Sequence, residues 1–298
     1  MSIQTFFNLL KISFREWRED NIIRHSASLA FYTIFSLAPI LLIVVDAVGL
    51  IFSKTYVEQE LLNQIRILIG PQGAEVARQA LTNFGLTSYD PIAALIGFLT
   101  VFLGATAVFA EIQAALNKIW DVRVKPNRSV LKRLLRQRLY SLGIVLGVGF
   151  LLLVSLLITT LLAVLQNFFA ARIISVPWLW QLLNTASSFF MVTLLFAMTY
   201  KYLPDVKLTW HDVGIGAGIT GALFTIGKFI IGKYLGQTAL AGAYGATGSL
   251  VVMLVWVYYS ALICFFGAEF TQVYTRRYGS EIQPKSHAVR IGKKSRKI

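Results

Sequence analysis

Charge is scarce in this chain of 298 residues. Charged side chains make up 14% of it and hydrophobic ones 56%, whereas soluble domains carry about 25% charged residues. Cysteine is almost absent, since Cys264 stands alone. A single thiol excludes an intrachain disulfide and a zinc site made of several thiolates. The composition is therefore not that of an ordinary water-soluble domain. The fold must be stable without an intrachain disulfide.

Histidine is nearly as rare, and this bears on catalysis. His25, His211 and His287 are scattered along the sequence, and no His-x-His or paired-Asp motif occurs. A metal-dependent nuclease needs clustered His, Asp and Glu side chains to hold the ions that activate water. We therefore expect no catalytic residue, no metal site and no cofactor, and we do not expect an enzyme.

Acidic residues are also few, and their scarcity leaves a large positive charge. The 14 Asp and Glu residues are outnumbered by 28 Lys and Arg residues, for a net charge of +14. Such an excess is typical of a nucleic-acid binder or of a membrane protein with basic loops. Eight of the basic residues lie in the segment 111–139 and eight follow Thr275. This clustering favours the membrane reading, with anionic lipid headgroups rather than nucleic acid as the partner.

Long hydrophobic runs are what the sequence has in abundance. About 20 apolar residues cross the hydrocarbon core of a bilayer, and six segments approach or exceed this length. We predict an all-α, polytopic integral membrane protein with a membrane domain at 27–275 and a basic, disordered tail at 276–298. The predicted spans are 27–53, 92–111, 141–166, 178–200, 213–235 and 249–274.

The positive-inside rule orients this topology. With six spans, 22 of the 28 basic residues fall on one side, and cytoplasmic loops are the ones that carry an excess of Lys and Arg. The prediction is a multi-pass membrane protein with both termini in the cytoplasm. A homo-oligomer is compatible with this sequence, which does not specify the oligomeric state.

Two further helical segments are expected outside the spans. In the N-terminal segment 1–26, apolar residues recur at helical spacing between polar ones, which is typical of an amphipathic helix lying on the bilayer surface. The apolar positions are Ile3, Phe6, Phe7, Leu10, Phe14 and Trp17. The first extracytoplasmic loop has an apolar helical face from Val57 to Leu68, a break at 70–73, and a second short helix at 74–84.

Four stretches of the sequence resemble the YihY/BrkB family of bacterial inner-membrane proteins, once labelled ribonuclease BN. They are SASLAFY at 26–32 running into SLAP at 36–39; AALNKIW at 114–120; LPD at 203–205 followed by the glycine-rich segment with Lys228 and Tyr234; and YGA at 244–246 leading to WVY at 256–258 and GAE at 267–269. The resemblance implies a six-span architecture, an association with virulence and serum resistance, and a transport role.

Ionisable residues within the spans are the candidate site, because charges inside a bilayer are costly and usually face a bundle interior or an aqueous path. Asp46 and Lys228 each lie seven residues before the outer end of a predicted span, about 10 Å deep at 1.5 Å per residue. We predict that they pair or face one outward-opening cavity. The alternative is that Asp46 sits at the interface and that Lys228 and Lys233 reach the headgroups.

Two carboxylates belong to the inner half of the same domain. Glu111 and Glu269 lie near the inner ends of the second and sixth spans. They could line a cytoplasmic vestibule, accept a proton, or pair with Arg24 or an arginine of the 132–138 cluster. A structural ion pair that locks helix ends is the simpler reading.

Prolines and glycines supply the hinge, gate and packing candidates. Pro39 removes a backbone hydrogen bond within the first span and should kink it. Gly242, Gly245 and Gly248 lie in a short charge-free segment that is either a re-entrant gate or a tight turn. Small residues on one helix face allow close helix approach. The predicted packing face comprises Gly214, Gly218 and Gly221.

The sequence is compatible with three functions. The first is a transporter or permease for a small or amphiphilic, lipid-linked substrate. The second is a membrane scaffold without transport activity, in which the basic tail binds a partner of the cell envelope. The third, and least supported, is a tRNA-processing ribonuclease, because the basic segments already follow from orientation in the membrane.

Overall fold

The computed structural model describes most of the chain, and the described part is largely helical. It covers residues 3–50, 52–69, 71–85, 107–125, 154, 177–237, 248–279 and 281–291. Its helices are α1 (Ile3–Glu19), α2 (Ile22–Gly49), α3 (Lys54–Ile69), α4 (Pro71–Gly85), α7 (Pro177–Tyr202), α8 (Trp210–Gln237) and α10 (Gly248–Tyr278), and residues 107–119 are also helical.

Three helices of the described part are long and apolar enough to cross a membrane. They are Trp178–Tyr202, Trp210–Ile231 and Leu250–Tyr278, within α7, α8 and α10. The prediction of a helical protein with membrane-spanning segments is confirmed at this level. The first predicted span coincides with α2, which ends at Gly49. The span at 92–111 is described only from residue 107, and that at 141–166 only at Val154.

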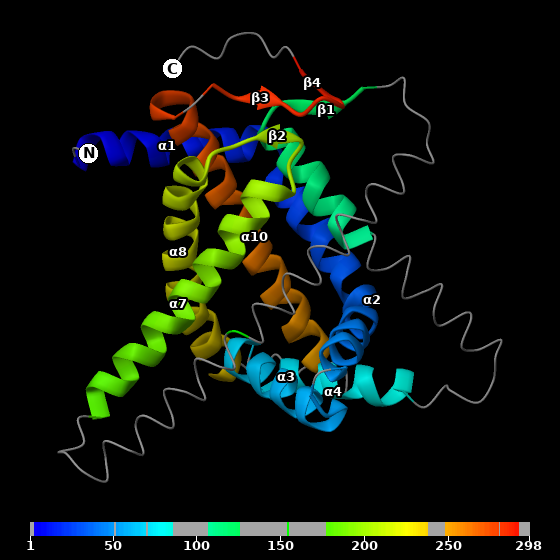
Figure 1. Cartoon of the computed structure of the whole chain (residues 1–298). Coiled ribbons are helices and arrows are strands. Elements are labelled where there is room, and N and C mark those ends of the chain that lie inside the picture. Colours follow the sequence, from blue (N-terminus) through cyan, green and yellow to red (C-terminus); the bar gives the residue numbers. More distant parts are fainter. Residues whose placement is uncertain are drawn as a thin grey trace.

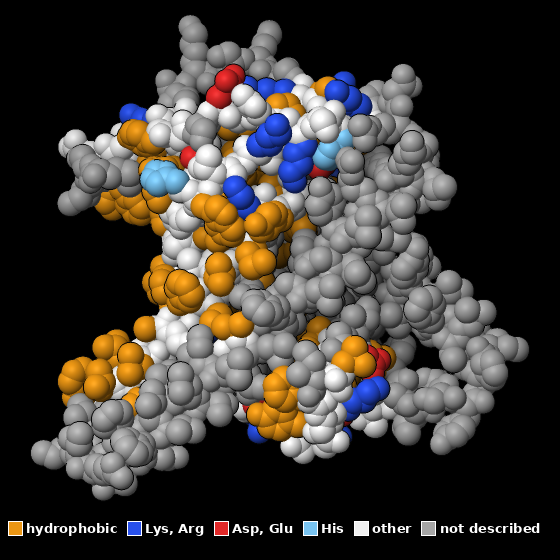
Figure 2. Space-filling view, in the orientation of Figure 1, with side chains coloured by type: hydrophobic (Ala, Val, Ile, Leu, Met, Phe, Trp, Pro, Cys, Tyr) orange, Lys and Arg blue, Asp and Glu red, His pale blue; other side chains and the backbone are white. Residues whose placement is uncertain are grey.

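The two ends of the helix bundle carry different elements (Figure 1). Helices α7, α8 and α10 run side by side, and α1 crosses one end of them together with four short strands, whereas α3 and α4 lie at the opposite end. On the face shown in Figure 2, Lys and Arg side chains gather at the end that carries α1, with hydrophobic side chains below them. A hydrophobic middle between polar ends is the pattern a bilayer requires.

Local sequence explains how two of these helices begin. Asn21 has a φ of 56°, a left-handed conformation that Asn tolerates better than most residues, and it turns the chain from α1 into α2. At the start of α8, the Thr209 hydroxyl donates to Asp212 at 2.6 Å and accepts the Asp212 amide at 3.2 Å. This reciprocal pair is a variant of the capping box.

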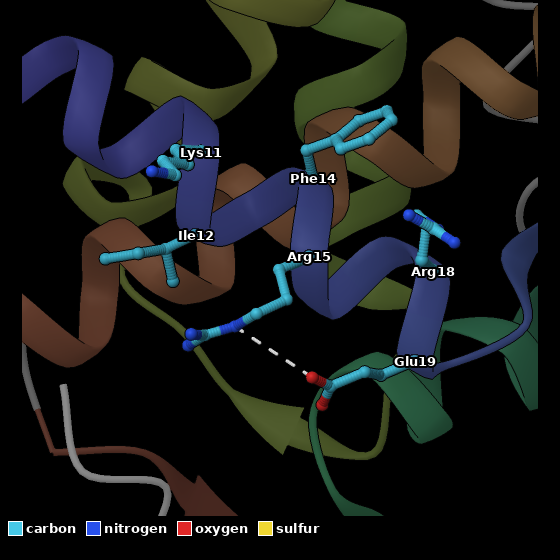
Figure 3. A pocket seen from close by; sticks show the side chains of 6 residues that line it. All are labelled: Lys11, Ile12, Phe14, Arg15, Arg18 and Glu19. Atoms are coloured by element: carbon cyan, nitrogen blue, oxygen red, sulfur yellow. Dashed lines mark ion pairs between the residues drawn. The ribbon is translucent and has the colours of Figure 1, made fainter.

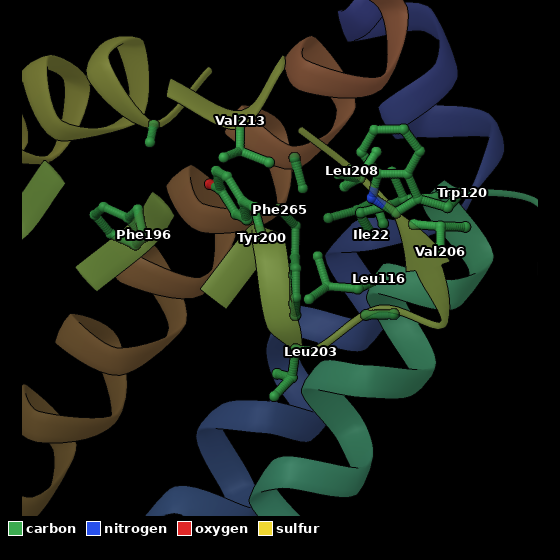
Figure 4. Close-up of a cluster of buried hydrophobic side chains, with 14 of the residues drawn as sticks. Ile22, Leu116, Trp120, Phe196, Tyr200, Leu203, Val206, Leu208, Val213 and Phe265 are labelled. Atoms are coloured by element: carbon green, nitrogen blue, oxygen red, sulfur yellow. The ribbon is translucent and has the colours of Figure 1, made fainter. Parts of the chain in front are cut away.

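The main hydrophobic core lies where α2, residues 107–122, α7, α8 and α10 meet (Figure 4). Leu116, Trp120, Tyr200 and Phe265 are fully or almost fully buried in it. A second core joins the C-terminal half of α2 to α3 and α4. Its buried residues include Val44, Val48, Val57, Leu61, Ile65 and Ala77.

The first loop is helical, as predicted, although its second helix begins earlier than expected. Helix α4 starts at Pro71 rather than at Ala74, and proline suits the first helical position because its missing N–H needs no partner there. Within α4, hydrogen bonds from Arg78 and Gln79 hold the pKa of the Glu75 carboxyl at about 2.

The C-terminal segment forms two short strands, which contradicts two predictions. Strand β4 (Ala288–Arg290) pairs antiparallel with β1 (Val122–Val124), and β3 (Gln283–Pro284) pairs antiparallel with β2 (Val206–Lys207). The fold is therefore not purely α-helical, and the prediction of a disordered tail is wrong for residues 281–291. The physical reason is that segments distant in sequence satisfy the tail's backbone groups.

The glycine by which α8 approaches α10 is not among the three predicted packing glycines. A Cβ atom built on Gly216 would lie 1.8 Å from the Thr271 hydroxyl oxygen of α10. On Gly214 or Gly218 it would meet no heavy atom within 4 Å among the described residues. Two helical positions span about 200°, so the predicted pair points away from α10. Gly221 does lie at a close approach, 2.3 Å from the Thr193 hydroxyl by the same construction.

Candidate functional site

A polar groove lies between α7 and α8, within the apolar part of both helices. It encloses about 200 Å³. Positions four apart lie on one helix face, and both helices follow this rule here. The described lining residues are Asn184, Thr185, Ser188, Phe189 and Val192 of α7 and Phe224, Thr225, Lys228 and Phe229 of α8.

Lys228 supplies the only charge among these lining residues. Its side chain is half-buried, and its ammonium nitrogen lies 5.8 Å from the centre of the Phe229 ring, within reach of a cation–π interaction. Asn184 and Ser188 offer an amide and a hydroxyl, and the Phe rings supply apolar walls. The groove therefore combines one positive charge, neutral polar groups and aromatic surface.

The groove lies part-way along α7, beside exposed apolar side chains. Asn184 and Ser188 lie seven and eleven residues after Pro177, the first residue of α7, or about 10 to 17 Å along the helix at 1.5 Å per residue. Around them, α7 keeps large apolar side chains exposed, among them Trp178 and Phe190. A polar groove thus opens beside a surface suited to lipid tails.

Asp46 does not belong to this groove, and its predicted pairing with Lys228 is wrong. The Asp46 carboxylate accepts a hydrogen bond from the Lys54 ammonium at 2.6 Å, and both side chains are well exposed. The reason is local, because α2 ends at Gly49 and α3 starts at Lys54, so the turn returns the lysine to the acid. Exposed pairs of this kind contribute about 0 to 1 kcal/mol.

Glu111 has a different partner from the one proposed. His25 Nδ1 lies 2.8 Å from a Glu111 carboxylate oxygen, which joins α2 to the helical residues 107–119. Arg24, one of the two predicted partners, is exposed, because adjacent helical positions differ by about 100°, and the 132–138 cluster lies outside the described residues. The scattered histidines gave no signal for this contact in the sequence.

The other residues that the sequence singled out lie in helices or outside the described residues. Glu269 is fully buried in α10, as are Thr271 and Gln272 beside it. Helix α2 continues through Pro39, and Gly248 is the buried first residue of α10. Gly242 and Gly245 lie outside the described residues, and the same is true of the choice between a gate and a turn.

A second polar cluster, which the sequence did not reveal as a site, surrounds Asp205 at the end that carries the strands. Asp205 is almost fully buried. One of its carboxylate oxygens lies 2.8 Å from His287 Nε2, and the other accepts from the Asn117 amide at 2.8 Å. Asn117 accepts from the Asp205 backbone amide in return. We call Asp205, Asn117, His287 and Gln113 the Asp205 cluster.

The Asp205 cluster joins three distant segments of chain. It connects the helical residues 107–119, the segment between α7 and α8, and the C-terminal strands. Two of the stretches behind the family resemblance, AALNKIW and LPD, meet in it. Nearby, Arg276 of α10 binds Glu16 of α1 at 3.3 Å and Asp121 at 3.0 Å. These buried contacts fix the end of the bundle that carries α1.

Metal chemistry has no visible support in the described ranges. Among these residues, no group of three or more His, Cys, Asp and Glu side chains could hold a metal ion. His25 and His287 each contact a different carboxylate at 2.8 Å, and His211 is exposed.

Comparison with known proteins places these features in a family. The profile of the family described as "Virulence factor BrkB" matches residues 13–292. Among curated proteins, a UPF0761 membrane protein of Psychrobacter sp. (strain PRwf-1) is 25% identical over 94% of this chain and 51% of its own length. One of Acinetobacter baylyi is 25% identical over 95% and 65%, and one of Alteromonas mediterranea is 25% identical over 90% and 91%.

The comparison is limited in length and in structural information. The chain spans about half to two thirds of the length of the first two relatives. No solved structure matches it.

Proposed function

The chain belongs to the virulence factor BrkB family of membrane proteins, and from this premise we propose that it is a transporter whose substrate is an amphiphile with an anionic head. The observation that carries the proposal is the groove between α7 and α8. Its lysine and neutral polar groups would bind the head, and the exposed apolar surface of α7 would leave the tail in the lipid. No catalytic step is part of this proposal.

The proposed setting is the bacterial inner membrane, with six spans and both termini in the cytoplasm. The gathering of Lys and Arg at the end that carries α1 and the strands supports this orientation. In this orientation, α3 and α4 lie outside the cell, and the groove lies nearer the outer face, since Lys228 is close to the far end of α8.

Two observations favour transport over the other functions. The tail residues 283–290 form strands with the protein itself, which leaves less of the tail free for a scaffold partner. A nuclease would need His or carboxylate groups brought to one substrate, whereas His25 and His287 each hold a single carboxylate in a different part of the chain.

The test is transbilayer movement of fluorescent phosphatidylglycerol in vesicles containing the purified protein, followed by dithionite quenching. We expect Lys228→Met to lower the protein-dependent rate about tenfold or more, because a charge-assisted contact contributes roughly 1.5 to 3 kcal/mol. Lys228→Arg should keep most of the rate.

The matched control is Lys54→Met, which removes an exposed cation from the same end of the molecule but outside the groove. It should leave the rate unchanged. If Lys54→Met and Lys228→Met slowed movement equally, the groove would have no special role, and the proposal would fail.

A further inference from the structure

Helix α1 has two opposite faces, and among the described residues one of them packs against α10 while the other is exposed. Leu9, Ser13 and Glu16 are nearly or completely buried and follow the spacing of one helix face, which buried Asp20 continues just beyond the helix end. Leu9 packs with Phe270 and Val273 of α10, and Glu16 binds Arg276 of the same helix. The orientation of α1 on the bundle is therefore fixed by both apolar and ionic contacts.

The opposite face of α1 alternates aromatic and basic residues. Phe7, Lys11, Phe14 and Arg18 follow the same spacing, offset by two residues or about 200° from the buried face. Phe7 and Phe14 are 65% and 53% exposed, and Lys11 and Arg18 are also exposed. Of the predicted apolar stripe, Phe6 and Leu10 pack against α10, whereas Phe7 and Phe14 lie on this exposed face beside the basic residues.

This face borders a groove of about 580 Å³ (Figure 3). Its described lining residues are Lys11, Ile12, Phe14, Arg15, Arg18 and Glu19. Three cations and one carboxylate line it, and Arg15 reaches Glu19 at 3.9 Å in a pair that is largely exposed. The groove therefore keeps an excess of positive charge.

The level of this groove matches a membrane interface. Helix α1 crosses α10 beside Phe270 and Val273, close to the end of the apolar helix at Tyr278. Aromatic and basic side chains together are typical of the headgroup layer, where rings reach the acyl boundary and cations reach phosphates.

We propose that this face of α1 is a binding site for an anionic phospholipid, with Lys11, Arg15 and Arg18 on the phosphate and Phe7 and Phe14 against the acyl chains. The site is independent of the proposed transport function, because it lies on α1 rather than between α7 and α8. Since α1 is fixed to α10, the cations are positioned before the lipid arrives, which lowers the entropic cost of binding.

The experiment measures phosphatidylglycerol bound to the purified full chain in detergent by native mass spectrometry. The triple variant Lys11→Gln, Arg15→Gln, Arg18→Gln should bind this lipid roughly a hundredfold more weakly, at about fivefold for each cation near the phosphate. Phosphatidylcholine should bind weakly to both proteins.

The control removes three exposed cations from the strands at the same end, with Arg123→Gln, Lys207→Gln and Arg290→Gln. It should change binding by less than about threefold, because charges beyond a Debye length of roughly 8 to 10 Å are screened. Equal loss in both triple variants, or no loss in either, would overturn the site. Unchanged binding in the α1 triple variant together with loss in Lys228→Met would place the bound lipid in the groove between α7 and α8 alone and would overturn the α1 site.

A further arm separates a lipid from a soluble phosphate. Excess glycerol phosphate should leave phosphatidylglycerol bound, because it lacks the acyl chains that contact Phe7 and Phe14. Full displacement by glycerol phosphate would show a simple anion site and contradict a lipid occupant.

Discussion

Gly216→Ala should destabilise the protein by about 3 kcal/mol, although alanine is the better helix former. The reason is a reciprocal contact between α8 and α10. A Cβ atom on Gly216 would lie 1.8 Å from the Thr271 hydroxyl oxygen and 3.1 Å from the Thr271 Cα, and one on Gly267 would lie 1.8 Å from the Thr220 hydroxyl oxygen. Backbone atoms limit the relief that side-chain rotation can give.

Each helix thus presents a Gly-xxx-Thr pair to the other. The two threonine hydroxyls donate to the carbonyls of their own glycines, Thr220 to Gly216 and Thr271 to Gly267, both at 2.7 Å. This satisfies the hydroxyl donors within each helix, so the two backbones can approach without leaving a buried proton unbonded.

Thermal unfolding in detergent, followed by fluorescence-detected size exclusion, measures this effect. Gly218→Ala is the matched control, because no described heavy atom lies within 4 Å of its Cβ position. We expect its Tm to stay constant or rise slightly, while the Tm of Gly216→Ala falls by about 5 °C or more. Adding Thr271→Ala to Gly216→Ala should recover part of the loss. Equal Tm values for the two alanine variants would contradict the close packing of α8 on α10.

Asp205→Ala should cost about 3 to 5 kcal/mol, because it removes a buried carboxylate from its hydrogen bonds with buried His287 and half-buried Asn117. His287 and Asn117 both lie 2.8 Å from its oxygens, and Asp205 and His287 are 1% and 5% exposed. The loss should also release the C-terminal strands, since His287 lies between β3 and β4.

Limited proteolysis reads out this release directly. In Asp205→Ala, cleavage after Lys285 or Arg290 should speed up strongly compared with the parent chain. Lys207→Ala, an exposed position two residues away, should change neither the cleavage rate nor the stability by more than about 0.5 kcal/mol. A tail that stays protected in Asp205→Ala would show that the Asp205 cluster does not hold it.

The sequence predicted the helices well where length and hydrophobicity decide the structure. The runs at 178–200, 213–235 and 249–274 fall within α7, α8 and α10, and the apolar face of Val57, Leu61 and Ile65 is buried as its spacing required. Strands of two or three residues are too short to show a recognisable alternation of apolar and polar residues. The charge of the basic tail therefore indicated disorder, and its strands could not be predicted.

The candidate site was harder to predict, because span positions give depth but not direction around the bundle. Asp46 and Lys228 were assigned equal depth, but Asp46 turns to Lys54. Lys228 was found, whereas Asn184 and Ser188 were missed, since neutral polar residues in a span gain meaning only once α7 lies along α8. For the same reason, the sequence predicted helix contact at Gly218, whereas the contact with α10 is made two residues earlier, at Gly216.

Head-group selectivity in vesicles tests the proposed movement of an anionic amphiphile across the bilayer. The measurement compares the rates of fluorescent phosphatidylglycerol and phosphatidylcholine in vesicles with the parent chain, with Lys228→Met and without protein. We expect phosphatidylglycerol to move faster than phosphatidylcholine with the parent chain and this preference to vanish in Lys228→Met. Phosphatidylglycerol movement no faster than in protein-free vesicles would contradict the account.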